Sequence, residues 1–146
     1  MLYLSHYFKR HRAAYYDHLQ AVRDTGDWES WLAFFLRGVA AVSAEATETA
    51  RRILALREDH RTLITSQLGR GAGTGHRVLE RLYERPIVSV DDVAGLTGIT
   101  YAAANDLVRR LVEHGVLTEV TGQRRHRRFR YDPYIRLFDE PPGAGS

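Results

Sequence analysis

Hydrophobic positions in residues 5–68 recur every three or four residues, which is the period of an α-helix with one buried face. Ser5 is a suitable N-cap for a helix that reaches about Arg23. Asp27 can cap the next helix, and no proline interrupts the chain from Trp28 to Leu68. We therefore expect one long helix over that range, roughly 60 Å at a rise of 1.5 Å per residue.

The first part of this long helix carries an unusually wide apolar face over residues 28–42. Its members are Trp28, Trp31, Leu32, Phe34, Phe35, Leu36, Val39 and Val42. One short partner helix cannot cover a face of this width, and burial of each large side chain is worth about 1.5–3 kcal/mol. We therefore expect self-association through this face, as a homodimer or higher oligomer.

The pattern changes after residue 75. It predicts a helix over 75–84, a short strand over 87–90, two helices over 93–97 and 101–114, and two hairpin strands over 116–120 and 127–131. Asp91 or Asp92 is the expected cap of the first of the paired helices, and Thr100 that of the second. This order is typical of a winged helix-turn-helix. The predicted fold class is mainly α, with one long helix and a winged helix-turn-helix that contains a small β-sheet.

Four glycines lie within residues 69–75, and such a segment is typical of a flexible linker. Alternating glycines also occur in phosphate-binding loops. Those loops follow a strand and often continue into Gly-Lys-Ser/Thr, and neither feature is present. The expected organisation is a helical segment (1–68), a linker (69–75), a winged helix (76–138) and a flexible tail (139–146).

Composition excludes several kinds of chemistry. The chain has no cysteine, which rules out disulfides, thiolate-bound zinc and cysteine catalysis and agrees with a cytoplasmic location. No apolar run reaches the 18 residues that a membrane helix needs, so no membrane partner is expected. The seven histidines form no His-Glu-x-x-His motif, and no serine lies in a Gly-x-Ser-x-Gly turn. We expect no enzyme activity, no metal and no cofactor.

Positive charge gathers in the C-terminal half of the chain. Residues 121–131 contain five arginines and no acid. On the returning strand, Phe129 and Tyr131 share one face while Arg128 and Arg130 share the other, because side chains alternate along a strand. The arginines then point outward, where they either contact DNA phosphates or form a charged edge that discourages strand pairing.

The second helix of the pair, over residues 101–114, would be the recognition helix. Asn105 is suited to adenine, and Arg109 to guanine or phosphate, whereas Asp106 opposes a phosphate backbone. DNA binding should therefore be weak and of low sequence specificity. The predicted DNA-binding residues are Tyr101, Asn105, Arg109, Arg110, Arg124, Arg125, Arg128 and Arg130.

Several segments resemble the C-terminal region of bacterial Fic proteins. In the N-terminal half these are Tyr3-Leu4-Ser5-x-Tyr7-Phe8-Lys9-x-His11-Arg12-x-x-Tyr15-Tyr16 and Gly26-Asp27-Trp28-Glu29-x-Trp31-Leu32. Many Fic proteins end in a winged helix, and residues 109–117 and 131–134 are similar to that ending. The resemblance covers roughly residues 2–138.

Fic enzymes transfer AMP from ATP to a protein hydroxyl through the motif HPFx(D/E)GNGR, and no stretch of this chain matches it. In that family the histidine is the general base, the acidic residue holds magnesium, and the glycines and arginine hold phosphates. The family would place this loop just upstream of Met1. The resemblance therefore implies a non-catalytic C-terminal region of a Fic-type AMP-transferase, with a winged helix that binds DNA weakly or regulates the parent enzyme.

A second interpretation does not involve DNA. In it the winged helix and the long helix form a protein–protein interaction or oligomerisation module that recognises the protein to be modified.

Overall fold

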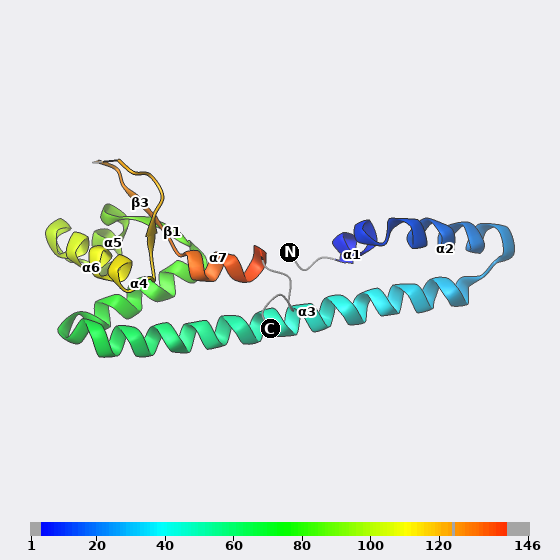
Figure 1. The fold of residues 1–146 in the computed structure, drawn as a ribbon, viewed down its shortest axis with the longest axis horizontal. Coiled ribbons are helices and arrows are strands. Elements are labelled where there is room, and N and C mark those ends of the chain that lie inside the picture. The colour runs from blue at the N-terminus through cyan, green and yellow to red at the C-terminus, as the bar shows by residue number, and fades with distance from the viewer. Residues whose placement is uncertain (1–3, 124, 140–146) are drawn as a thin grey trace. The chain divides into compact units, whose positions relative to one another are not determined.

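The computed structural model describes residues 4–123 and 125–139 (Figure 1). The fold is mainly α with a small three-stranded antiparallel sheet, so the predicted fold class is confirmed at this level. The described residues up to Arg51 belong to one compact unit, and those from Arg52 onward belong to another. The boundary lies inside the longest helix.

The first unit contains α1 (Leu4–Arg10), α2 (Arg12–Thr25) and the beginning of α3 (Trp28–Leu68). The sequence predicted one helix from Ser5, and this was wrong, because His11 has φ −108° and ψ 37° and separates α1 from α2. Gly26, at φ 71°, ends α2. The Asp27 carboxylate accepts a hydrogen bond of 3.1 Å from the backbone N–H of Ser30, so the predicted cap of α3 is confirmed.

Aromatic side chains hold α1 and α2 against α3. Phe8 stacks on the buried Phe34 at 5.7 Å between ring centroids, and Tyr15 meets Trp31 edge-on at 5.4 Å. Gly38 is buried beneath Tyr7, where an added Cβ would lie 2.8 Å from the ring. These contacts cover one side of the predicted apolar face of α3.

The second unit contains the end of α3 followed by α4 (Ala72–Glu84), β1 (Ile87–Ser89), α5 (Val90–Thr97), α6 (Tyr101–Glu113), β2 (Thr118–Glu119), β3 (Arg128–Arg130) and α7 (Asp132–Asp139). The strand order is β1-β3-β2, and Phe129 lies opposite both Val88 and Glu119. This helix and strand order, with β3 central, is that of a winged helix-turn-helix. Helix α7 was not predicted.

The core of this unit includes residues that precede the glycine-rich segment. Ile64 and Leu68 of α3 are buried together with residues of α4, α5, α6 and the sheet, among them Leu79, Leu82, Val93, Leu111 and Phe129. The end of α3 is therefore an integral helix of the second unit.

The prediction of a flexible linker over 69–75 was wrong. Residues 69–71 form a 3₁₀ turn, and Ala72 begins α4. Gly75 is buried, and a Cβ added there would lie 2.9 Å from Ile64 Cγ2 and 3.0 Å from Leu68 Cδ2. The glycine thus permits close packing of α4 on α3, which the count of glycines alone did not reveal.

Caps in the second unit partly follow the prediction. The backbone N–H of Asp92 donates to Ser89 Oγ (3.1 Å), and the N–H of Ser89 donates to Asp92 Oδ2 (2.7 Å). Ser89, rather than Asp91 or Asp92, is therefore the N-cap of α5, and the carboxylate of Asp92 completes a capping box. Thr100 caps α6 as predicted, by accepting from the N–H of Ala103.

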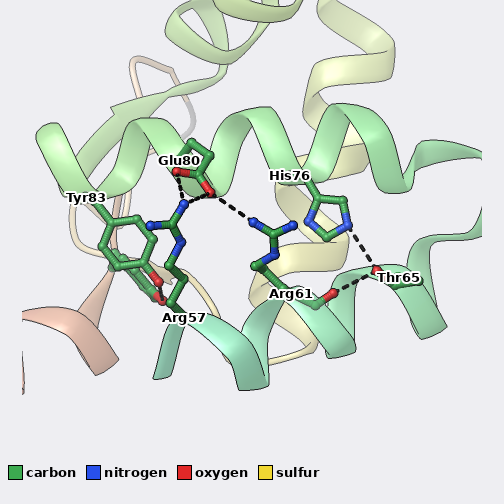
Figure 2. Close-up of polar contacts among 7 residues, drawn as sticks. Arg57, Arg61, Thr65, His76, Glu80 and Tyr83 are labelled. Carbon is green, nitrogen blue, oxygen red and sulfur yellow. Dashed lines mark hydrogen bonds and ion pairs between the residues drawn. The ribbon is translucent and has the colours of Figure 1, made fainter. Parts of the chain in front are cut away.

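Polar contacts also join α3 to α4 (Figure 2). Arg57 donates to both carboxylate oxygens of Glu80, at 2.7 and 2.8 Å, and Arg61 lies 3.6 Å from the same carboxylate. One turn away, the hydroxyl of Thr65 donates to the carbonyl of Arg61 and therefore accepts from Nε2 of His76, at 3.0 Å. These bonds fix the orientation of α4 along the last turns of α3.

A buried tyrosine connects the sheet to both helices. Tyr131, which follows β3, is fully buried, and its hydroxyl lies 2.7 Å from His60 Nδ1 and 3.4 Å from the Tyr83 hydroxyl. Burial raises the pKa of Tyr131 and lowers the pKa of His60. The hydrogen bond between Tyr131 and His60 therefore joins a neutral phenol to a neutral imidazole.

Within residues 4–123 and 125–139, no helix is both long and apolar enough to cross a membrane.

Candidate nucleic-acid interface

Helix α6 and the hairpin β2–β3 present the residues that the sequence predicted to face DNA. Tyr101, the first residue of α6, is exposed. Phe129 and Tyr131 are buried in the core, whereas Arg128 is exposed and Arg130 is half-buried. The predicted alternation along the returning strand is therefore confirmed.

An open groove of about 600 Å³ runs between the start of α6 and the hairpin of β2 and β3 with its connecting loop, which we call the wing (residues 118–130). Its lining is Tyr101, Asn105, Glu119, Gly122, Gln123 and Arg127. Two of the predicted DNA-binding residues, Tyr101 and Asn105, thus lie in one groove beside the wing.

Arg127 links α6 to the hairpin and was absent from the predicted site. Its Nη2 donates to Asn105 Oδ1 at 2.6 Å, its Nη1 lies 3.7 Å from Glu119 Oε2, and its guanidinium lies over the Phe129 ring at 5.3 Å. The alternation of side chains could have identified Arg127, because it lies two residues before Phe129 and four before Tyr131 and so points to the same side, toward the helices.

The two arginines of α6 already have partners. Arg109 pairs with Asp106 at 2.5 Å and with Glu113 at 2.6 Å, and the hydrogen bond that Arg109 donates to Asp106 is the main reason why the pKa of Arg109 is raised. Arg110 points to the end of α3, where its guanidinium donates to the carbonyls of Gln67 and Leu68. Arg110 therefore caps α3, a role that the sequence pattern did not indicate.

The wing arginines differ in their surroundings. Arg128 lies 3.8 Å from Asp92, and Arg130 forms a hydrogen-bonded ion pair with Asp132 that raises the pKa of Arg130. Arg125 is exposed and has no ion pair within the described part of the chain. Arg124, also predicted to bind DNA, lies outside the described residues.

Most of the ion pairs at this surface are exposed, and such pairs are each worth about 0–1 kcal/mol. A phosphate group can therefore replace a carboxylate at Arg109 or Arg128 at small cost. Asp106, Glu113 and Glu119 nevertheless place negative charge along the same surface, which opposes tight binding of a polyanion.

Other candidates for a site are a second cleft and the acidic and histidine side chains of the described residues. Among the described residues, no cluster of three or more histidine, aspartate or glutamate side chains has a metal-binding arrangement. A cleft of about 700 Å³ lies between α4, β1 and α5, and the acidic residues in its lining are Glu84, Asp91 and Asp92. Glu84 pairs with Arg81, and the carboxylate of Asp92 completes the capping box that Ser89 begins.

A search against models of known protein families finds none that matches this chain. The resemblance to Fic proteins therefore stays a prediction.

Proposed function

We propose that this chain is a non-catalytic C-terminal region of a Fic-type protein AMP-transferase, and that its winged helix binds DNA weakly or regulates the parent enzyme. The observation that carries the DNA contact is the open groove beside α6, together with Arg125, which is exposed and has no ion pair among the described residues. A winged helix with basic residues at this place has the geometry to contact phosphates on both sides of a groove.

The salt dependence of duplex binding tests this contact. Arg110 is bonded to α3, so the candidates for phosphate contacts are Arg109 of α6 and Arg124, Arg125, Arg128 and Arg130. Five contacts predict a slope of log K against log salt of about −4.5, at about −0.9 per contact. Replacing Arg124 and Arg125 together with alanine should flatten the slope by about 1.8. Absence of duplex binding at low salt would refute the DNA contact.

The transfer of AMP is the other half of this proposal. The chain contains no HPFx(D/E)GNGR sequence, so residues 1–146 alone should not label any protein from ATP. Incubation with labelled ATP, magnesium and a cell lysate tests this directly. Label incorporation that depends on this chain would contradict the proposal.

A second candidate function, an interaction or oligomerisation module, is favoured by an exposed stripe on α3. Trp28, Leu32, Leu36 and Val39 are 61%, 53%, 62% and 37% exposed, whereas α1 and α2 cover Phe34. Steps of four, four and three residues place the four exposed side chains on one face of the helix. A second copy of the chain is the partner that we propose for this stripe.

Sedimentation at high micromolar concentration tests the second candidate, because it measures whether the protein is a monomer or a dimer. Leu36→Glu places a charge at the centre of the stripe and should shift a dimer to monomer. Ala44→Glu adds the same charge at an exposed position of α3 outside the stripe and should leave the dimer intact. A strictly monomeric wild-type protein would refute self-association.

A further inference from the structure

The contact between Arg127 and Asn105 fixes the orientation of the Asn105 carboxamide. A guanidinium group has five N–H donors and no acceptor, so only the oxygen of the carboxamide can face it. Arg127 Nη2 donates to this oxygen at 2.6 Å. The Asn105 amino group is left without a hydrogen-bond partner among the described residues, and Asn105 lines the open groove.

Arg127 is itself held in place from two further sides. Its Nη1 lies 3.7 Å from Glu119 of β2, and its guanidinium lies 5.3 Å from the centre of the Phe129 ring in β3. The side chain is half-buried, unlike the exposed Arg125. Contacts within the chain therefore engage the Arg127 guanidinium, and both strands of the hairpin set its position.

This arrangement changes what Asn105 can bind. A bidentate contact with adenine requires the carboxamide oxygen to accept from adenine N6 while the amino group donates to N7. The guanidinium of Arg127 takes one of the two lone pairs of that oxygen, and its positive charge beside the oxygen disfavours the approach of a second donor such as adenine N6. Guanine presents two acceptors, N7 and O6, which require only donors.

We propose that Arg127 is a positioning residue that turns the Asn105 amino group toward the groove and disfavours a donor at the Asn105 oxygen, so that the groove prefers guanine over adenine. This inference rests on the proposed DNA binding and replaces the adenine contact that the sequence alone suggested for Asn105. It assigns a role in base preference to a wing arginine that makes no phosphate contact.

Selection from a random duplex pool at low salt tests the inference. The wild-type protein should enrich guanine over adenine at one position by about fivefold, the effect of about 1 kcal/mol of base discrimination. Asn105→Ala should abolish the preference. Arg127→Met keeps an apolar stem over Phe129 and frees the carboxamide oxygen, so the preference should move toward adenine. A residue with a merely structural role would not produce such a switch.

The salt slope supplies a matched control. Arg127→Met should change the slope of log K against log salt by less than about 0.5, whereas Arg125→Met should flatten it by about 0.9. A guanine preference that persists in Arg127→Met, or an equal slope change in both variants, would overturn the assignment while leaving DNA binding intact.

A measurement without DNA separates the two proposals. In NMR spectra of the free protein, the Arg127 guanidinium should rotate slowly about its Cζ–N bonds, while that of Arg125 rotates freely. Equal, fast rotation of both groups would refute the contact with Asn105. Slow rotation of Arg127 without any duplex binding would instead refute the proposed function and, with it, any base preference.

Discussion

Replacement of Gly75 by alanine tests whether the glycine-rich segment is packed structure or a linker. A Cβ at this position would lie 2.9 Å from Ile64 Cγ2 and 3.0 Å from Leu68 Cδ2. These distances are about 0.5 Å or more shorter than an optimal carbon–carbon contact. Both neighbours are buried core side chains, so neither can move into solvent.

The expected loss follows from two opposing effects. Overpacking of a core costs about 1–3 kcal/mol, while alanine in a helix gains about 0.5–1 kcal/mol over glycine. Gly75→Ala should therefore lower the free energy of unfolding of the second unit by up to about 2.5 kcal/mol. Gly95→Ala is the matched control, because Gly95 is exposed within α5 and an added Cβ meets nothing within 4 Å. It should stabilise the unit by about 0.5–1 kcal/mol.

The assay must report on the second unit alone. Both tryptophans, Trp28 and Trp31, lie in the first unit, so their fluorescence is unsuitable. Native-state hydrogen exchange at core amides such as those of Leu79 and Leu111 measures the opening of the second unit directly. If Gly75→Ala were as stabilising as Gly95→Ala, the close packing of α4 on α3 would be refuted and the linker interpretation restored.

Three further predictions concern pH, capping and packing in the first unit. Because burial lowers the pKa of His60 below its ordinary value of 6.5, the unfolded state binds more protons, and the stability of the second unit should fall as the pH drops below about 6.5. His60→Gln keeps a neutral hydrogen-bond partner for Tyr131 and should reduce this dependence in exchange measurements from pH 5 to 7. Ser89→Ala removes the cap of α5 and should lower the free energy of unfolding by about 0.5–2 kcal/mol, as measured by urea titration. Asp91 is exposed and makes no side-chain cap bond, so Asp91→Ala should lower it by less. Gly38→Ala should displace the Tyr7 ring, because the added Cβ would lie only 2.8 Å from it. A change in the NMR signals of the Tyr7 ring would report this displacement.

Helical periodicity and cap chemistry account for the parts of the fold that were predicted correctly. Asp27 and Thr100 act as caps, and α3 runs unbroken from Trp28 to Leu68, because these features depend on local sequence. The buried position of Gly75 depends on Ile64 and Leu68, which lie on another helix. Composition therefore gave the wrong structure for residues 69–75.

The candidate site was predicted less completely than the fold. Position along the strand correctly predicted that Phe129 is buried and Arg128 is exposed, because alternation of side chains is a property of the strand itself. The partners of Arg110 and Arg127 come from other elements, α3 in one case and α6 with β2 in the other. A single sequence shows that these arginines are present, but it does not show which of them form hydrogen bonds or ion pairs within the chain.

Because the end of α3 supplies Ile64, Leu68 and His60 to the winged-helix unit, the glycine-rich segment is not a place where this unit can be separated. A polypeptide of residues 76–138 would expose the apolar surfaces that Ile64 and Leu68 cover, and the Tyr131 hydroxyl would lose its hydrogen bond with the His60 imidazole. A polypeptide that starts near Arg52 retains all three. In protein engineering or in gene fusion, the transferable module therefore includes the last turns of the long helix, and recombination within residues 69–75 would divide one hydrophobic core between two proteins.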